Sequence, residues 1–358
     1  MKANVSRRTF VMSSGATLMA ALMSACGGGQ SGDAATPSDA AKQAGIDYMA
    51  LVNKTHALPE GWEDAVEIVH FKNTEDWDVD VEAKAYDAYL AFKEDLEADD
   101  VYVDLDSAYR SVAAQQEIVD DFTKKYGVEY VKQYVAVPGY SEHHTGLALD
   151  LFLIIDGKGV YENEDMVLYP ELWSKIHAKL ADHGFILRYL PQKKIETGYS
   201  YEPWHIRYLD DVEAASKIME EGITLERYLD ELDPMIADAV VDYASSKLYT
   251  EADIDSALEV VLAEFTSWTG CTLKRISYAG DDACTAEEIA WMNELREANT
   301  PDAEEFDQTL VFTSDFHSPS EKEAEGTAWE PDADYNNWTW HLGRVGADGG
   351  WQLMTWGY

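Results

Sequence analysis

The sequence of 358 residues predicts an α+β fold built on a small antiparallel sheet flanked by helices. Short apolar strand patterns lie close together along the chain, and amphipathic helix patterns stand between and around them. The 46% of hydrophobic residues, with 11 Trp and 21 Tyr, exclude a mainly disordered chain. A chain of this length has room for two domains.

The formal net charge of -41 is extreme. It repels phosphate backbones, so we expect no nucleic-acid partner. Acidic residues occur in most segments, which is typical of a solvated, highly soluble surface. A cationic ligand is the alternative, but no segment localises one. No pattern indicates an oligomeric state.

The N-terminus, residues 1–26, is predicted to be an export signal. Lys2, Arg7 and Arg8 form a positive region, and the apolar run 10–23 that follows is too short to span a membrane stably. The segment around the two arginines resembles a twin-arginine signal, which would mean export in the folded state.

The end of this signal, Leu-Met-Ser-Ala-Cys at 22–26, resembles a bacterial lipobox. A lipid on Cys26 would hold the protein at the outer membrane surface without a spanning helix. The alternative is a soluble exported protein in which Cys26 is incidental. Residues 27–45 are rich in Gly, Ser, Ala and Asp, which is typical of a flexible tether.

Residues 46–234 are predicted to form the first domain. Helical periodicity covers four segments: 83–96, 111–126, 170–183 and 210–221. Strand patterns cover four more: 101–105, 147–155, 185–189 and 204–209. Ser111 is a plausible N-cap, and Gly127 is a plausible stop for the same helix. Pro170 and Gly184 bracket the third helix.

Residues 235–358 are predicted to form a second, smaller α+β domain with a curved sheet. Its expected helices are 237–268, broken near 248–250, and 285–298; its expected strands are 272–278, 308–316, 335–345 and 351–356. On pattern alone it resembles cystatin-like or NTF2-like domains. Cys271 and Cys284 could form a disulfide across a short loop, or could remain two buried thiols. The late Trp residues are expected to fill a core rather than to stack on sugars.

Two stretches, 141–150 and 202–208, carry the chemistry. His143, Asp150 and His205 offer three ligands with one open position, as in a catalytic zinc site. Asp150 lies within an apolar run, where a carboxylate is costly unless it is paired or bound to a metal. Glu202 is then the general base that such a site needs.

The neighbours of these residues agree with that interpretation. Pro203 bends the chain and can bring Glu202 and His205 to one side. His144 is not expected to be a ligand, because adjacent side chains on an extended backbone point in opposite directions. The sequence lacks the Ser-x-x-Lys, Gly-x-Ser-x-Gly and His-Glu-x-x-His motifs of other hydrolases.

The segment from Leu51 to Leu209 resembles the zinc D-alanyl-D-alanine carboxypeptidases of the VanY type. The resemblance rests on ordered blocks: Ser141-x-His143-x-x-Gly146-x-Ala148-x-Asp150, Glu202-Pro203-Trp204-His205, Ser107-Ala108-Tyr109-Arg110-Ser111-x-x-x-Gln115, and the segments 136–140 and 184–189. It implies a D-Ala-D-Ala metallopeptidase-like fold for the first domain.

The resemblance also implies roles. Zn²⁺ would be held by His143, Asp150 and His205, and Glu202 would move the proton from the attacking water to the leaving amine. Arg110 would bind the substrate's terminal carboxylate, assisted by Ser141 and Gln115; a guanidinium fork suits that group.

The implied substrate is the peptidoglycan stem peptide, from which the terminal D-alanine would be removed outside the cytoplasm. An L,D-carboxypeptidase acting on tetrapeptide stems is one alternative, and a D,D-dipeptidase is another. A non-catalytic lipoprotein that binds wall peptide is the alternative that is not an enzyme.

Overall fold

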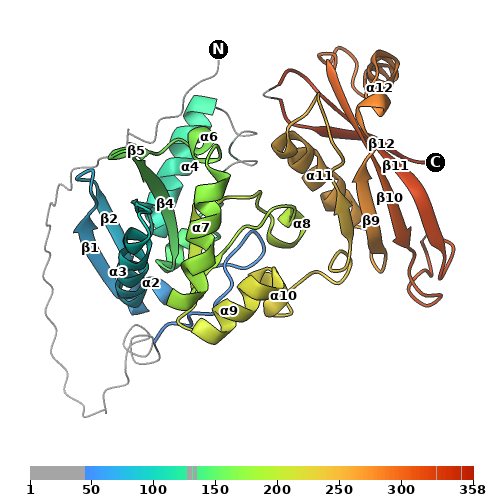
Figure 1. Cartoon of the computed structure of the whole chain (residues 1–358). Coiled ribbons are helices and arrows are strands. Elements are labelled where there is room, and N and C mark those ends of the chain that lie inside the picture. The colour runs from blue at the N-terminus through green and yellow to red at the C-terminus, as the bar shows by residue number, and fades with distance from the viewer. Residues whose placement is uncertain (1–44, 127–130, 132–134, 328, 348) are drawn as a thin grey trace, which may run out of the picture.

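The computed structural model describes residues 45–126, 131, 135–327, 329–347 and 349–358. The predicted export signal, Cys26, nearly all of the tether and the Gly127 stop lie outside the described residues. Within the described part of the chain, no helix is long and apolar enough to cross a membrane. We call residues 45–234 the N-terminal half and residues 235–358 the C-terminal half (Figure 1); the domain boundary between them stays a prediction.

The main sheet of the N-terminal half has five strands in the order β3-β4-β7-β6, with β5 paired to β4. Every neighbouring pair is antiparallel, as the sequence predicted. The strands are β3 (Val103–Ser107), β4 (Ala148–Ile155), β5 (Lys158–Val160), β6 (Phe185–Leu187) and β7 (His205–Tyr208). A separate hairpin of β1 (Ile68–Lys72) and β2 (Asp78–Glu82) was not predicted.

Helices surround this sheet. They are α2 (Trp62–Ala65), α3 (Ala83–Ala98), α4 (Val112–Tyr126), α6 (Asn163–Met166), α7 (Pro170–Leu180), α8 (Lys194–Thr197), α9 (Val212–Glu221) and α10 (Leu225–Tyr228), with the 3-10 turns η2 (Glu142–Thr145) and η3 (Ala181–His183). Ser111 caps α4 as predicted, because its Oγ accepts from the Ala114 amide at 3.1 Å. Pro170 begins α7, where its missing amide costs nothing.

The core of the N-terminal half lies between the sheet and the helices α3 and α7. Phe92 of α3, Phe152 of β4 and Trp173 of α7 are each at most 1% exposed. Burying one such side chain stabilises the fold by roughly 1.5–3 kcal/mol. This packing fixes β4, the strand whose first residues enter the candidate site.

The C-terminal half has a five-stranded sheet of order β12-β11-β10-β9-β8. Its elements are β8 (Val240–Asp242), α11 (Glu251–Phe265), β9 (Thr272–Tyr278), η4 (Asp281–Ala283), α12 (Ala286–Asn299), β10 (Gln308–His317), β11 (Asp334–Arg344) and β12 (Gln352–Gly357). All its pairs are antiparallel except β8 with β9. The α+β class is confirmed for both halves, whereas the cystatin-like or NTF2-like resemblance stays a prediction.

The helix predicted from 237 is wrong in its first part. Val240 and Val241 belong to an edge strand, because two adjacent β-branched residues suit a pleated surface better than a helix. The helix begins only at Glu251, after a capping box in which Thr250 and Asp253 each accept from the other's backbone amide.

Aromatic rings fill the core of the C-terminal half. Trp340 is fully buried, and its ring stacks on that of Trp268 at 4.9 Å between centroids. Phe265 contacts both of these rings, at 5.4 and 6.4 Å, and Phe316 contacts Trp268 at 5.6 Å. These contacts agree with the predicted role of the late Trp residues in packing.

Cys271 and Cys284 are both free thiols, so the possible disulfide does not form. Cys271 stands just before β9 and Cys284 follows the turn after its end. Seven residues of strand extend about 23 Å, whereas a disulfide requires Cα atoms within about 7 Å. The segment between the two cysteines, which looked like a short loop in the sequence, is mostly the extended strand β9 and keeps the two thiols apart.

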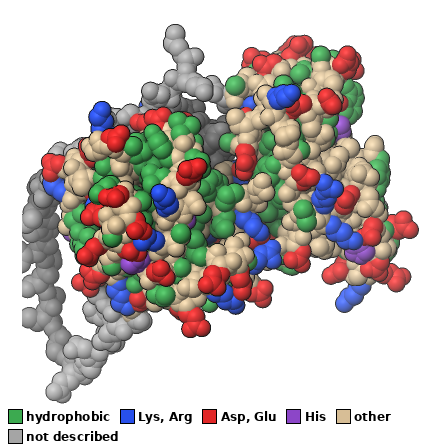
Figure 2. Space-filling view, in the orientation of Figure 1, with side chains coloured by type: hydrophobic (Ala, Val, Ile, Leu, Met, Phe, Trp, Pro, Cys, Tyr) green, Lys and Arg blue, Asp and Glu red, His purple; other side chains and the backbone are tan. Residues whose placement is uncertain are grey.

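Acidic side chains spread over both halves. Figure 2 shows Asp and Glu on most of the visible face, interspersed with fewer Lys and Arg. This distribution agrees with the predicted solvated surface.

Candidate metal centre and active site

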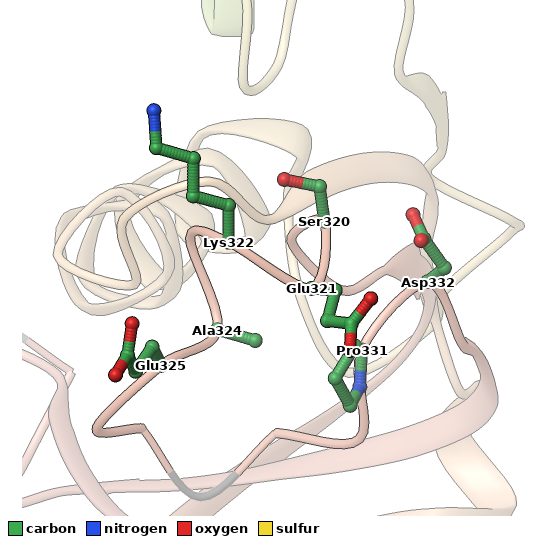
Figure 3. A pocket seen from close by; sticks show the side chains of 7 residues that line it. All are labelled: Ser320, Glu321, Lys322, Ala324, Glu325, Pro331 and Asp332. Carbon is green, nitrogen blue, oxygen red and sulfur yellow. The ribbon is translucent and has the colours of Figure 1, made fainter.

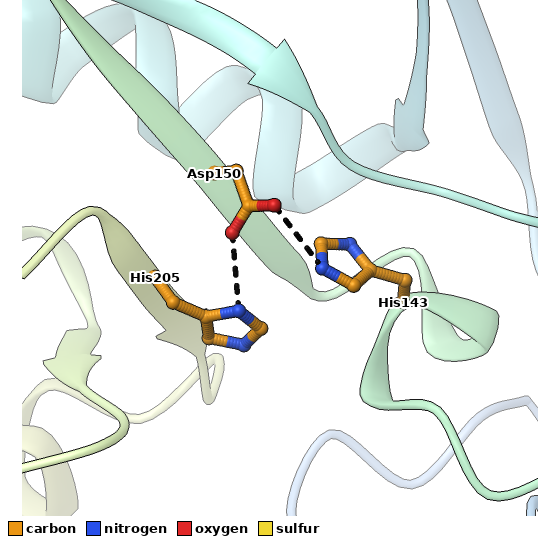
Figure 4. A group of neighbouring side chains, drawn as sticks. All are labelled: His143, Asp150 and His205. Atoms are coloured by element: carbon orange, nitrogen blue, oxygen red, sulfur yellow. Dashed lines mark ion pairs between the residues drawn. The ribbon is translucent and has the colours of Figure 1, made fainter. Parts of the chain in front are cut away.

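The sheet itself brings two of the predicted ligands together. In the antiparallel pair of β4 and β7, Asp150 lies directly opposite His205. Opposite residues project from the same face with Cβ atoms about 5 Å apart. His143 comes from η2, the short turn that precedes β4, and points at the same carboxylate (Figure 4).

The three side chains have the spacing of metal ligands. His143 Nε2 lies 3.3 Å from Asp150 Oδ2, and His205 Nδ1 lies 3.1 Å from Asp150 Oδ1. One donor atom from each residue falls within 4.8 Å of the others, and this trio is the one such group in the described parts of the chain. Donors bound to zinc at 2.0–2.2 Å in a tetrahedron are about 3.4 Å apart. The donor set therefore fits zinc.

Each imidazole is oriented by its other nitrogen. His143 Nδ1 lies 2.8 Å from the Ala108 carbonyl oxygen and donates to it, which leaves Nε2 free to bind a metal. His205 Nε2 lies 3.1 Å from Glu142 Oε2, which leaves Nδ1 for the metal. Such outer contacts fix the tautomer and the ring plane of a metal-bound histidine.

Glu142 is a functional residue that the sequence interpretation missed. Its Oε1 accepts from Arg188 Nε at 2.7 Å and from Arg207 Nη1 at 2.8 Å. Arg188 also donates twice to Glu226, at 2.6 and 2.9 Å. All four side chains are at most 3% exposed. Two cations and two anions thus balance beneath His205.

The alternation of β7 explains how this network reaches the site. His205 and Arg207 are two residues apart, so they share one face of the strand. Burial alone would raise the pKa of Glu142, but Arg188 and Arg207 hold that pKa far below its usual range. Glu142 therefore remains an anion that can accept from His205.

The ligands have shifted pKa values of their own. Burial lowers the pKa of His143. Burial would also lower the pKa of His205, but hydrogen bonds to Asp150 and Glu142 outweigh it and raise that pKa to about 10. Burial would raise the pKa of Asp150, yet the two imidazoles hold it well below normal. Metal binding would therefore release a proton from His205.

Glu202 lies at the edge of this trio. Its Oε2 is 3.6 Å from His205 Nδ1, and its side chain is 33% exposed. The His205 amide donates to the Glu202 carbonyl oxygen at 3.2 Å, which closes a turn through Pro203. This is the bend that the sequence predicted. A carboxylate placed there can exchange protons with a ligand bound at the trio.

Arg110 lies next to His143. Its amide donates to the His143 carbonyl oxygen at 3.0 Å. Its guanidinium donates to Gln115 Oε1 at 2.9 Å and to Ser107 Oγ at 3.4 Å. Gln115 is 1% exposed and is itself tied to the Ala136 carbonyl oxygen at 2.8 Å. Gln115 thus orients Arg110, while the buried Ser141 immediately precedes η2.

His144 is not part of the trio, although the expected reason was wrong. The backbone at 142–145 is a 3-10 turn, not an extended strand. His144 Nε2 accepts from the Gly139 amide at 3.0 Å, so its Nδ1–H donates to the Arg110 carbonyl oxygen at 2.6 Å. Through these two hydrogen bonds, His144 ties the backbone at Arg110 to the turn at Gly139.

A hollow on the C-terminal half shows no comparable chemistry. It is lined by seven residues of the 320–332 segment, among them Lys322, Glu325 and Asp332 (Figure 3). Figure 3 shows the charged groups of Lys322 and Glu325 directed away from the centre of the hollow. We assign it no function.

Two imidazoles and a carboxylate around a common point, with a second carboxylate beside them, are an arrangement that metal-dependent hydrolases use. The family model described as "VanY: D-alanyl-D-alanine carboxypeptidase" matches residues 78–211. The chain belongs to this VanY family of D-alanyl-D-alanine carboxypeptidases.

Individual relatives match the N-terminal half. A D-alanyl-D-alanine carboxypeptidase of Enterococcus faecalis (strain ATCC 700802 / V583) is 34% identical over 190 residues, which cover 51% of this chain and 65% of that protein. The bifunctional D-Ala-D-Ala dipeptidase and D-Ala-D-Ala carboxypeptidase VanXYC of Enterococcus gallinarum is 33% identical over 192 residues, covering 52% of this chain and 96% of that protein.

Among solved structures, the chain is similar to a mutant of the vancomycin resistance D,D-pentapeptidase VanY from a VanB-type cassette, in complex with Zn(II). The identity is 31%, the match covers 51% of this chain and 99% of that one, and the TM-score is 0.42.

Proposed function

We propose that this protein is a zinc-dependent carboxypeptidase that removes the C-terminal D-alanine from peptidoglycan stem peptides. The observation that carries the proposal is the convergence of His143, Asp150 and His205, with Glu202 beside His205 and Arg110 beside His143. Membership of the VanY family supports the same reaction.

Substrate recognition would begin at Arg110. A carboxypeptidase must select a free terminal carboxylate, and a guanidinium can bind both of its oxygens. Gln115 and Ser107 orient the guanidinium by accepting hydrogen bonds from it. Ser141, buried beside η2, is a second candidate contact for the same carboxylate. This end of the site would fix the terminal residue so that its peptide carbonyl lies over the trio.

His143, Asp150 and His205 would hold the zinc ion. When bound, zinc polarises the scissile carbonyl and makes water acidic enough to attack at neutral pH. Glu142 would keep His205 in the orientation that directs Nδ1 to the ion.

Glu202 would act as the general base and then as the general acid. It takes a proton from the attacking water as the new carbon–oxygen bond forms. It then delivers that proton to the amide nitrogen as the carbon–nitrogen bond breaks. The products are free D-alanine and a peptide one residue shorter. Its partial exposure allows it to meet water and leaving group alike.

The test is turnover of peptides that differ only at the C-terminus. A pentapeptide ending in D-Ala-D-Ala should release one D-alanine, and a chelator should abolish the release until zinc is restored. Release from a tetrapeptide alone would indicate the L,D-carboxypeptidase, and release of the D-Ala-D-Ala dipeptide would indicate a dipeptidase. Peptide binding without any release would contradict the enzyme and favour the wall-peptide binder.

We further propose that the protein works outside the cytoplasm, attached to the membrane by a lipid on Cys26. The lipobox-like segment at 22–26 supports this attachment, and a wall-peptide substrate requires export. The full chain should partition into the detergent phase of a Triton X-114 extraction, and Cys26→Ser should move it to the aqueous phase. Aqueous partitioning of both would contradict the anchor.

A further inference from the structure

The segment that carries Glu202 contacts the C-terminal half directly. We call residues 188–204, which join β6 to β7, the base loop. It contains the four-residue helix α8, and Figure 1 shows α8 facing α11 of the C-terminal half. The family match ends at residue 211, so α11 lies outside it.

The first contact is a hydrogen bond between Ser200 and Asp255. Ser200 Oγ donates to Asp255 Oδ2 at 2.7 Å. Asp255 is 2% exposed, and its other oxygen accepts from the Tyr243 hydroxyl at 2.5 Å. A buried carboxylate is stable only with such partners. One oxygen of Asp255 is therefore fixed by Tyr243 of the C-terminal half, and the other binds Ser200 of the base loop.

The second contact is a group of charges one helical turn further along α11. Glu259 pairs with Lys54 at 2.6 Å and with Lys194 of α8 at 3.5 Å. The side chain of Lys194 is 12% exposed, and its Nζ also reaches Ser200 Oγ at 3.3 Å. Ile195, also in α8, packs on the apolar core of the C-terminal half.

From this junction, aromatic rings lead to the candidate metal site. Lys54 Nζ lies 5.3 Å from the ring centroid of Tyr199, which follows α8. The Tyr199 ring is 4.7 Å from that of Tyr189, and the Tyr189 ring is 4.7 Å from that of His205. Glu202 is two residues beyond Ser200.

We propose that α11 is a positioning element for the general base: Asp255 and Glu259 hold the base loop so that Glu202 faces the metal ligands. The inference rests on the proposed function of Glu202. Asp255, Glu259 and Ser200 touch no reacting atom and are positioning residues. A loop with little regular structure loses conformational entropy when it is ordered, and these contacts offset part of that cost.

The main test is Ser200→Ala in the full-length, zinc-loaded protein acting on a D-Ala-D-Ala pentapeptide. Hydrogen bonds to charged groups are among the stronger ones in proteins, so losing this one should loosen the base loop. We expect kcat to fall about 5- to 10-fold, KM to stay within about twofold, and zinc content to be unchanged. Ser200→Thr, which keeps the hydroxyl, should restore kcat to within about twofold of wild type.

Ser246→Ala is the matched control. Ser246 donates to Asp281 at 2.6 Å within the C-terminal half, so its loss should leave kcat unchanged. Amide hydrogen exchange supplies a readout that does not depend on activity. In Ser200→Ala, the amides of residues 199–202 should exchange about 5- to 10-fold faster, while those of β4 and β10 should not change.

A charge exchange tests the second contact. Glu259→Lys places a cation against Lys54 and Lys194, and kcat should fall more than in Ser200→Ala. Adding Lys54→Glu should recover part of the loss. Lys274→Glu, which breaks a pair with Asp334 of the same 2.6 Å length elsewhere in the C-terminal half, should leave kcat unchanged.

The outcomes separate the two proposals. If the wild type hydrolyses the peptide while Ser200→Ala and Glu259→Lys keep full kcat and normal exchange, the positioning inference alone is overturned. A rise in KM with an unchanged kcat in these variants would overturn it as well. An inactive wild type overturns the proposed function and, with it, the inference built on that function.

Discussion

The two halves of the molecule each have a five-stranded sheet, yet they bury different chemistry. Beneath His205, the N-terminal half buries Glu142, Arg188, Arg207 and Glu226. The C-terminal half fills its centre with rings such as Trp340 and Phe316. In its described residues, two charged side chains are buried, Asp255 and Arg344.

The difference shows where this chain tolerates an energetic cost. Removing charges from water costs several kcal/mol per ion, and well-packed apolar residues are often a more stable choice. The C-terminal half takes that choice except at Asp255, which faces the base loop, and at Arg344, which pairs with Asp253 at 2.8 Å. The N-terminal half keeps four of its buried charges beneath a proposed metal ligand, whereas the buried Glu82 and Asp104 serve the start of α3 and the Tyr89 hydroxyl.

The largest effect should follow from Glu202→Ala, which leaves the buried charges untouched. Loss of a general base lowers turnover by roughly 10²- to 10⁴-fold. The variant should still bind one zinc ion, because Glu202 is not among the three ligands. Measuring kcat and zinc content checks this prediction. A near-normal kcat would show that Glu202 is not the general base.

Arg110→Ala should affect recognition more than the chemical step. We expect kcat/KM to fall about 10²-fold on peptides with a free carboxylate, since a charge-assisted pair contributes about 2–3 kcal/mol. Peptides with an amidated C-terminus are the control and should change little. Equal losses on both kinds of peptide would contradict a carboxylate contact.

Glu142→Gln breaks the balance of the buried network. It should lower zinc affinity about 10- to 100-fold by releasing His205, and it should cost about 3–5 kcal/mol of unfolding free energy by leaving buried arginines underpaired. Both are measurable, by competition with a chromogenic chelator and by denaturant unfolding. Unchanged values for both would mean that the network is not needed for the site.

The same variant should change the response to acid. The folded-state pKa of Glu142 is lowered, so its contribution is present above its ordinary pKa of 4.5 and is lost as the pH falls below that value. Glu142→Gln should therefore flatten the decline in stability below about pH 4.5. The prediction would be contradicted if the free energy of unfolding of the variant fell as steeply below about pH 4.5 as that of the wild type.

The matched change in the C-terminal half is Asp253→Asn, which weakens the pair with Arg344. Asp253 is 24% exposed in its side chain, so water can replace much of the pair. We expect a loss below about 1 kcal/mol and no change in zinc binding. A loss as large as that from Glu142→Gln would remove the contrast between the halves.

The smallest effect concerns the thiols. Burial raises the pKa of the Cys271 thiol to about 11, so at pH 8 this group stays protonated and shielded. In the Cys26→Ser chain, a thiol reagent should find Cys271 unreactive in the native protein and should count Cys271 and Cys284 as two thiols after denaturation without reductant. One or no reactive thiol after denaturation would restore the disulfide interpretation.

The sequence was sufficient for those parts of the site that are carried by local patterns. His143, Asp150, His205 and Glu202 were singled out because their spacings and neighbours form a family signature, and the structure places them side by side. The central strand β4 was predicted from an apolar run that Asp150 alone interrupts. Ser111 and Pro170 marked the starts of their helices because capping depends on adjacent residues.

What the sequence could not provide depends on distant partners. Arg207 stands in the short strand β7 and Arg188 directly follows β6. An isolated charge at such a position usually indicates exposure, and the partners of these two arginines lie 38 to 65 residues away. The only available signal was that both interrupt otherwise apolar segments. The hydrogen bond from Ser200 to Asp255 spans 55 residues and joins two predicted domains. No local pattern indicates such a pair.

The pairing of β4 with β7 has a consequence for how this protein can change. Because Asp150 and His205 are neighbours across a sheet ladder, their separation is set by backbone hydrogen bonds and not by the segment that connects the strands. The segment that connects the strands could therefore vary in length and composition and could gain new contacts, such as those with α11. The separation of Asp150 and His205 would not change. The segment between the strands can therefore change and gain new contacts without altering the distance between the two proposed metal ligands.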